Sequence, residues 1–145
     1  MNARLLFEDR GLKTFAVVFE TGDEVISGLT GFAKEQKLAG SHFTAIGAFR
    51  DATLAYFDWE KKAYLKNPVR EQVEVVSLVG DVALDPDGAP KVHAHVVLGR
   101  RDGTALGGHL MEAHVRPTLE VVLTETPGHL RRRHDPQSGL ALIRP

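Results

Sequence analysis

The sequence predicts an α+β domain in which a mostly antiparallel, curved β-sheet or sandwich is covered on one face by one main amphipathic helix. Three observations support this prediction: one helical stripe of apolar residues near the N-terminus, many short β-branched and aromatic runs after it, and turn signals between those runs. The connections are too short for helical crossovers, so neighbouring strands are expected to be antiparallel.

The first predicted elements are a strand and the helix. Residues 14–19 (TFAVVF) form a β-branched and aromatic run of strand length. The helical stripe that follows consists of Val25, Ile26, Leu29, Phe32 and Ala33. Thr21 and Glu24 have the spacing of a capping box at the helix start, and Gly40 is expected to stop the helix. Glycines at 28 and 31 each cost about 1 kcal/mol relative to alanine, which indicates close packing against the helix at both positions.

The remainder of the chain is predicted to be strands. Turn signals such as Asp87-Gly88 and Asp102-Gly103 separate them. The expected strands cover residues 42–48, 52–58, 62–66, 72–83, 92–99, 104–110, 119–124 and 140–143. Residues 1–145 are therefore interpreted as one domain, with a core over about 12–124 and a C-terminal loop and short strand over 125–145.

Composition restricts the classes of function. The 145-residue chain contains no cysteine, so disulfides, thiolate nucleophiles and cysteine metal ligands are excluded. Its formal net charge of −1 gives no excess of basic residues for nucleic-acid phosphates. No run approaches the length of a membrane span, and the N-terminal apolar run of residues 5–7 is too short for a signal peptide. The expected location is the cytoplasm.

The segment KVHAHVVLGRRDGTALGGHL, residues 91–110, carries the strongest functional signal. Side chains alternate along a strand, so His93 and His95 point to one face while Val92, Ala94 and Val96 point to the other. The valine face is the expected core face, which leaves both imidazoles facing a cavity, an interface or water.

The position of a third histidine depends on the turn. A three-residue loop of Arg101, Asp102 and Gly103 would place His95 directly opposite His109, with Cβ atoms about 4.5–5.5 Å apart. A two-residue loop would instead turn His109 to the wrong face unless a bulge at residues 107–108 restored it. The metal hypothesis therefore predicts the longer loop or the bulge.

Three histidines on two adjacent strands suit a divalent metal, zinc above the others, and leave a coordination position open for water or a substrate oxygen. Nickel, copper or iron would also accept this donor set. Glu112 and Glu120 are candidate catalytic bases or fourth ligands. The alternative interpretation is a row of hydrogen-bonded histidines on an exposed sheet face, with no ion.

Three aromatic residues, Phe57, Trp59 and Tyr64, lie near an expected hairpin tip. They are interpreted as packing within their own subunit, with a pocket wall or a subunit contact as alternatives.

The quoted motifs also resemble a known family. The segments HFTAIGAFRDATLAYFD (42–58), EVVSLVGDV (74–82), HAHVVLGRRDG (93–103) and GGHL (107–110) are similar to the plants-and-prokaryotes-conserved (PPC) domain over nearly the whole chain. The resemblance implies an α+β fold, a homotrimer and metal ligation by His93, His95 and His109. The HxH motif followed by a later histidine is also distantly similar to α-acetolactate decarboxylase, a zinc enzyme.

Two functions follow as hypotheses. In the first, the three-histidine site binds zinc and senses or acts on a small carbonyl or carboxylate metabolite; as an enzyme the protein would be a metal-dependent lyase or hydrolase. In the second, a trimer acts as a DNA-binding regulator through Arg131, Arg132, Arg133 and Arg100. Plant relatives bind DNA through an AT-hook with the motif RGRP, which this sequence lacks.

Overall fold

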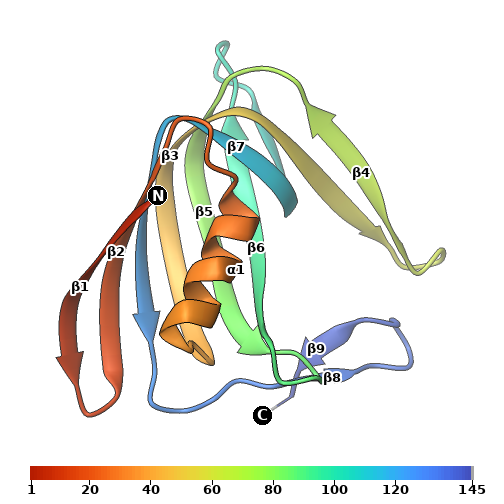
Figure 1. The fold of residues 1–145 in the computed structure, drawn as a ribbon. Helices are drawn as coiled ribbons and strands as arrows, with labels where there is room; N and C mark the ends of the chain where they lie inside the picture. The colour runs from red at the N-terminus through yellow and green to blue at the C-terminus, as the bar shows by residue number, and fades with distance from the viewer. Residues whose placement is uncertain (145) are drawn as a thin grey trace.

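A computed structural model describes residues 1–144 of the chain. This part contains one helix and nine strands (Figure 1): β1 (Asn2–Asp9), β2 (Leu12–Glu20), α1 (Val25–Gln36), β3 (Gly40–Asp58), β4 (Ala63–Val69), β5 (Val73–Leu84), β6 (Pro90–Gly99), β7 (Ala105–Glu125), β8 (Arg132–His134) and β9 (Ala141–Ile143). The predicted α+β class, with a mostly antiparallel curved sheet and a single main helix, is confirmed.

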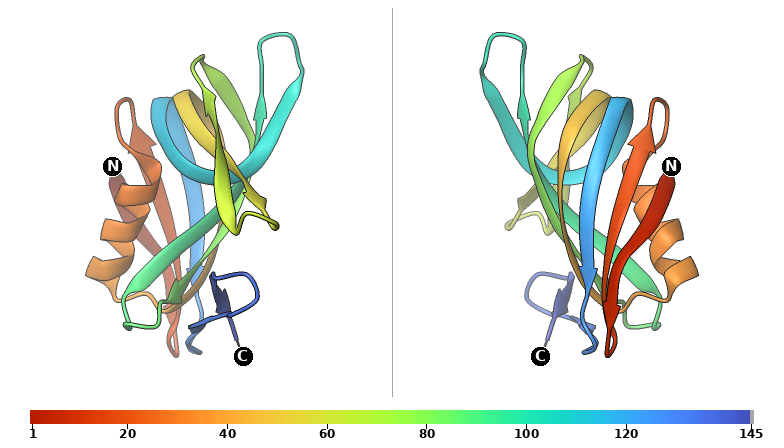
Figure 2. Two further views of the ribbon diagram at one scale, coloured as in Figure 1. Left: turned by 90° about the vertical axis from the view of Figure 1, so that its right-hand side faces the viewer. Right: turned by 90° about the vertical axis from the view of Figure 1, so that its left-hand side faces the viewer.

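Seven strands form one strongly curved sheet in the order β1-β2-β7-β6-β5-β3-β4, and all of its pairings are antiparallel. An additional pairing of β7 with β3 closes β3, β5, β6 and β7 into a ring. The β1–β2 hairpin and the β3–β4 hairpin extend from this ring in different directions, and β8 and β9 form a separate two-stranded sheet near the C-terminus (Figures 1 and 2).

Strands β3 and β7 are longer than the sequence predicts. Each was expected as two strands, yet each continues through the residues between them, at 49–51 and 111–118. Register shifts at Gly47 and at three later points along β3 let the pair bend without ending. A Cβ atom on Gly47 would lie 2.2 Å from the carbonyl oxygen of Thr118, so only glycine allows the two strands to approach this closely.

Helix α1 buries the predicted stripe, but both of its ends differ from the prediction. Glu24 is itself the N-cap, because its carboxylate accepts hydrogen bonds from the backbone N–H groups of Ile26 and Ser27. Thr21 instead donates to the carbonyl of Pro117. The helix ends before Lys37, which adopts the left-handed conformation at φ 56°, so Gly40 is not its stop.

Two strands, one exposed and one short, were not predicted from the sequence. All eight residues of β1 are exposed, so this edge strand has no hydrophobic alternation by which to recognise it. Strand β8 lies in the segment expected to be a loop and is held by three pairs with β9.

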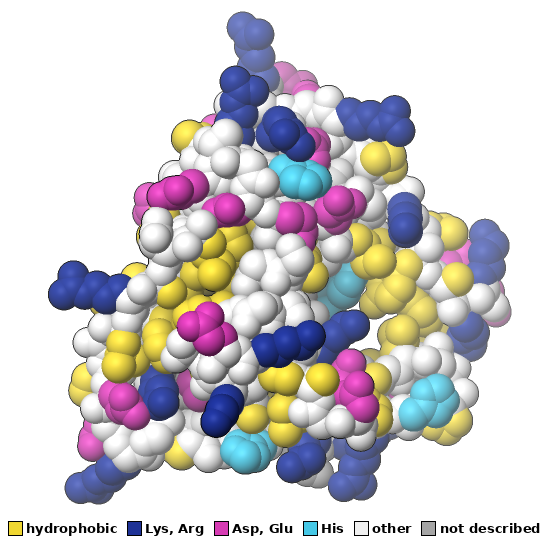
Figure 3. Space-filling model, viewed as in Figure 1, with side chains coloured by type: hydrophobic (Ala, Val, Ile, Leu, Met, Phe, Trp, Pro, Cys, Tyr) yellow, Lys and Arg dark blue, Asp and Glu magenta, His cyan; other side chains and the backbone are white. Residues whose placement is uncertain are grey.

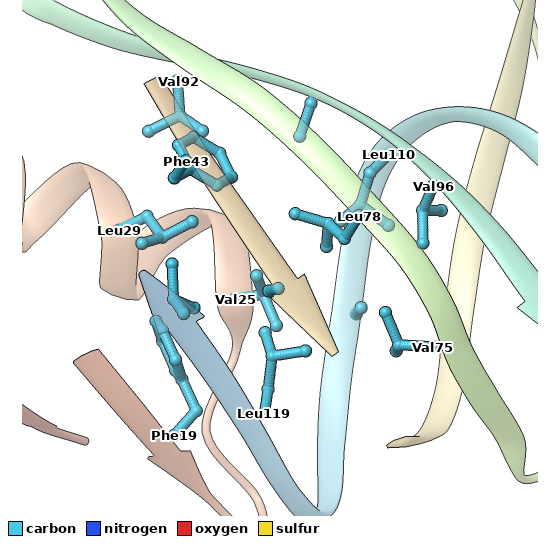
Figure 4. Packing of buried hydrophobic residues seen from close by; sticks show 14 of the residues in the cluster. Phe19, Val25, Leu29, Phe43, Val75, Leu78, Val92, Val96, Leu110 and Leu119 are labelled. Carbon is cyan, nitrogen blue, oxygen red and sulfur yellow. The ribbon is translucent and has the colours of Figure 1, made fainter. Parts of the chain in front are cut away.

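The core lies inside the closed part of the sheet and under α1 (Figure 4). Phe19, Leu29, Phe43 and Leu119 are among its fully buried side chains. Along β6, Val92, Ala94, Val96 and Leu98 are buried, so the predicted assignment of the valine face to the core is confirmed. No helix within residues 1–144 is long and apolar enough to span a membrane.

The two helix glycines have different surroundings, and this difference is testable. A Cβ atom on Gly28 would lie 2.5 Å from the ring of the buried Phe19, whereas one on Gly31 would meet no atom of the described residues within 4 Å. The expected close packing therefore holds for Gly28 and is wrong for Gly31.

We predict that Gly31→Ala raises the free energy of unfolding by about 0.5–1 kcal/mol, because alanine restricts the unfolded chain and favours the helix. Gly28→Ala should lower it by roughly 1–2 kcal/mol, because overpacking against an aromatic ring outweighs the same gain. Urea denaturation of both variants measures the difference. Equal shifts of the same sign would contradict this account of the helix packing.

Candidate metal centre

The β6–β7 turn has the three-residue form that the metal hypothesis requires. The backbone N–H of Arg100 donates to Thr104 O at 2.8 Å, and Gly103, at φ 82°, donates to Arg100 O at 2.9 Å. The side chain of Asp102 fixes the turn by accepting from the backbone N–H of Thr104 at 2.9 Å.

This turn places His95 directly opposite His109. The pairing runs without a shift from Gly99 opposite Ala105 to His95 opposite His109, so the alternative bulge at residues 107–108 is not used. The predicted longer loop and the predicted facing of the histidines are therefore confirmed.

The three imidazoles form a compact triangle on the outer face of the sheet. Their ring centroids are 5.1 Å apart for His93 and His95, 5.1 Å for His93 and His109, and 5.4 Å for His95 and His109. One nitrogen of each ring can be chosen so that all three lie within 4.8 Å of one another. Ligation at 2.0–2.1 Å per nitrogen therefore requires only side-chain adjustments of about an ångström.

The protonation of the rings suits metal binding. Burial lowers the pKa of His109 to about 4, and repulsion from His93 and His95 in their protonated forms and from Lys91 acts in the same direction. Burial also lowers the pKa of His95 from its usual value, with a further contribution from His93. Both rings are thus uncharged at neutral pH, which is the form that ligates a metal.

One atom of the triangle lacks any partner in the protein. Nδ1 of His109 is buried and makes no hydrogen bond to the described residues. Buried polar atoms in native proteins are almost always satisfied, so an unpaired imidazole nitrogen beside two other imidazoles fits a metal ligand. The donor set and this orphaned nitrogen together fit the metal that the sequence predicts.

Side chains from other elements surround the triangle. Tyr64 on β4 stacks on His109 with ring centroids 4.8 Å apart. Asp81 on β5 lies opposite His93 in the sheet, with its Oδ2 3.6 Å from His93 Nδ1, and it pairs with the guanidinium of Arg132. In Figure 3 a histidine lies in the recess between the β3–β4 hairpin and the C-terminal hairpin, next to hydrophobic side chains.

The structure places neither predicted glutamate beside the histidines. Glu112 approaches a different ring, with its Oε1 3.9 Å from His114 Nε2. Glu120 lies opposite Val18 and Ile46 and lines a separate surface hollow with Glu74.

Among residues 1–144, Asp81 is the acidic residue with a carboxylate within 4.0 Å of a histidine of the triangle. Sequence analysis missed Asp81, and only its register opposite His93 could have found it.

The four arginines of the alternative hypothesis have different environments. Arg131 and Arg133 are exposed. Arg100 pairs with Glu71 at 2.9 Å. Arg132 is buried, with 7% of its surface exposed, and is paired with Asp81, so it does not form part of an exposed basic surface. The buried position of Arg132 therefore argues against its predicted part in a DNA-binding surface.

Comparison with known proteins agrees with this fold. The model of the Plants and Prokaryotes Conserved (PCC) domain matches residues 7–127, and the chain belongs to this family. No curated protein matches the sequence.

Solved structures of three proteins superpose closely. A metal-containing protein from Archaeoglobus fulgidus is 36% identical, with a TM-score of 0.86 over 97% of this chain and 99% of the other. A plant- and prokaryote-conserved protein from Pyrococcus horikoshii is 32% identical, with a TM-score of 0.85 over 99% and 95% of the two chains. A candidate DNA-binding protein from Bacteroides thetaiotaomicron is 26% identical, with a TM-score of 0.85 over 98% and 96%.

The expected distant similarity to α-acetolactate decarboxylase is also found. A Staphylococcus aureus protein described as similar to that enzyme is 13% identical, with a TM-score of 0.53 over 77% of this chain and 51% of the other. At this identity the likeness concerns the fold alone.

The lowered pKa values lead to a prediction about pH. Protons compete with the metal for the imidazoles, and the competition strengthens as pH falls. Zinc bound at neutral pH should be released progressively as pH falls from the usual 6.5 toward the His109 pKa of about 4, and should rebind when pH is raised. Zinc content after dialysis across this range measures the release. Full retention at the acid end, or loss already at neutral pH, would contradict the assignment of these rings as ligands.

Proposed function

We propose that this protein binds a divalent metal ion, with zinc as the first candidate, through His93, His95 and His109. The observation that carries the proposal is the β6–β7 register, which brings three imidazoles, two of them on adjacent strands opposite each other, to one point. The description of the Archaeoglobus fulgidus relative as metal-containing supports the same proposal. A small carbonyl or carboxylate metabolite is the proposed ligand of the site.

The protein's own residues have separate tasks in this proposal. When bound, zinc supplies a Lewis acid that polarises an oxygen of a ligand or of water. The three imidazoles hold the ion, and Tyr64 fixes the ring of His109 by stacking on it. Asp81, whose Oδ2 lies 3.6 Å from His93 Nδ1, is the proposed partner that orients this ring when the ion is bound.

The arrangement of the residues supports metal binding more directly than catalytic turnover of a substrate. A lyase or hydrolase would need a group that moves a proton, and the carboxylate beside the histidines, Asp81, is already paired with Arg132. We therefore propose a metal-dependent binding or sensing role.

The proposal includes a homotrimer. Five β-branched residues on the outside of the closed strands are between 42% and 61% exposed: Ile46, Val76, Val79, Val97 and Val122. Exposed apolar patches of this kind are typical of protein interfaces, and homo-oligomers usually close with cyclic symmetry. A second copy of the chain is the proposed occupant of this patch, which we call the outer valine face.

DNA binding remains the alternative. The Bacteroides thetaiotaomicron relative is described as a candidate DNA-binding protein. In this chain, however, Arg132 is buried, Arg100 is paired, and the net charge of −1 provides little attraction for phosphates. These features favour the metal site as the function.

We predict that the protein purified with zinc present contains about one ion per chain, and that a His93→Ala, His95→Ala double variant contains less than a tenth as much, since one imidazole cannot retain the ion. Elemental analysis by mass spectrometry measures the content. A His42→Ala, His134→Ala double variant is the matched control, because it removes two exposed histidines elsewhere. Equal zinc in all three proteins would refute the site.

We also predict that Val122→Glu converts the trimer to smaller species, because a buried, unpaired carboxylate opposes association. Light scattering coupled to size-exclusion chromatography measures the mass. Leu6→Glu, on the exposed edge strand β1, is the control and should leave the mass unchanged. A monomeric wild type, or a trimeric Val122→Glu variant, would contradict the proposed interface.

A further inference from the structure

A pocket of about 420 Å³ lies directly beside the three-histidine site. His93 and His109 form part of its wall, so any molecule in the pocket would meet the proposed ion. Its other lining residues are mostly apolar and come mainly from α1, β6, β7 and the C-terminal hairpin; they include Ile26, Val92, Leu110, Met111 and Leu142. A concave, mostly apolar pocket with a few polar groups is typical of a site for a small organic molecule.

The pocket wall carries two cations, Lys91 and Arg132, and one carboxylate, Asp85. Asp81 pairs with Arg132, so the protein's own charges at this place balance. A divalent ion on the histidines would therefore give the pocket a net positive charge. A negatively charged ligand is therefore favoured over a neutral or cationic one.

Arg132 has unused hydrogen-bonding capacity. Its guanidinium carries five N–H groups, and its side chain makes one hydrogen bond to the described residues, from Nη2 to Asp81. Its Nε is buried and has no hydrogen-bond partner among residues 1–144. A buried guanidinium normally satisfies its donors with carboxylates or phosphates, so this arginine has room for a second anion besides Asp81.

The segment that carries Arg132 is fixed to the rest of the protein. The backbone of Leu130 donates to Ala39 O and accepts from the N–H of Leu84, both at 2.8 Å. Within the hairpin, Asp135 is bound by Ser138 and by Arg144, the latter at 3.1 Å. Arg132 is therefore held in place before any ligand arrives, which lowers the entropic cost of binding.

The C-terminal hairpin, which carries Arg132, lies outside the region matched by the family model, because that region ends at residue 127. Its two strands are β8, which begins at Arg132, and β9, which ends at Ile143. The histidines therefore belong to the matched domain, whereas the C-terminal hairpin adds its own contacts to the pocket.

We propose that Arg132, assisted by Lys91, binds the carboxylate of a short organic acid whose hydroxyl or carbonyl oxygen faces the three-histidine site. The C-terminal hairpin then determines which ligand the metal site accepts. This inference rests on the proposed metal binding and adds the residues that select the ligand.

Calorimetric titration of the zinc-loaded protein with lactate and with 3-hydroxybutyrate tests the proposal. At least one of the two acids should bind at millimolar concentration, and its uncharged amide should bind at least about tenfold more weakly, because a charge-assisted hydrogen bond is lost. Arg132→Gln should weaken binding of the acid by a similar factor. Arg133→Gln, which removes the same charge from the exposed neighbouring residue, should leave the affinity unchanged within about twofold.

Arg132→Gln also leaves Asp81 without its partner, so a change in affinity could come from Asp81. A second measurement therefore uses the wild-type protein alone. In the wild-type protein, the acid should shift the side-chain Nε–Hε resonance of Arg132 in a nitrogen-15 spectrum and leave that of Arg133 in place. Arg132→Lys, which keeps the charge beside Asp81 but loses the planar fork, should weaken binding several-fold.

The outcomes separate this inference from the metal site itself. Normal zinc content together with equal affinities in the Arg132 and Arg133 variants, no resonance shift, or no binding of either acid would overturn the anion site and leave the metal site standing. Absence of zinc from the wild-type protein would instead overturn the proposed metal binding.

Discussion

The register of the β6–β7 hairpin is the constraint on which the site depends. Side chains alternate between the two faces of a strand, so a shift of one residue would move His109 from the outer face into the core. The three-residue turn of Arg101, Asp102 and Gly103 prevents this shift, because Gly103 alone of the three adopts a positive φ and Asp102 binds the following backbone N–H. The residues of this short turn thus decide whether the three histidines of the proposed metal site can meet.

Because of the same alternation, one face of the sheet packs in the core and the other carries the proposed site. The inner face of β6 contributes Val92, Val96 and Leu98 to the core, while its outer face presents the histidines. Long strands with bulges, β3 and β7, close the sheet and carry the β3–β4 hairpin with Tyr64 to the outer face. The C-terminal hairpin approaches from the other side with Arg132, so the outer face becomes a pocket instead of an open surface.

Much of this architecture could be predicted from the sequence. The helix stripe, most strands, the turn type and the three facing histidines follow from local patterns, because periodicity and turn residues act over a few positions. The partners of the histidines could not be predicted in this way. Asp81, Arg132 and Tyr64 come from separate strands, and only the tertiary register brings them to the site.

Local sequence patterns also failed to predict features that depend on burial or on tertiary contacts. Strand β1 has no buried face and therefore no alternation to detect. Glu24 caps the helix and also accepts a hydrogen bond from the backbone N–H of Ala113 at 3.2 Å, a contact between residues 89 positions apart that no local pattern indicates. Glu112 and Glu120 are candidates from the sequence because zinc sites often recruit carboxylates, but the direction of a side chain along a long, bulged strand is not fixed by sequence.

X-ray absorption spectroscopy at the zinc edge of the reconstituted protein tests the central claim most directly. The account predicts three imidazole ligands with zinc–nitrogen distances of about 2.0–2.1 Å and a remaining position filled by a lighter donor such as water. A spectrum with one imidazole or none, or a shell made mainly of carboxylate oxygens, would show that the hairpin does not bring its three histidines to a common ion.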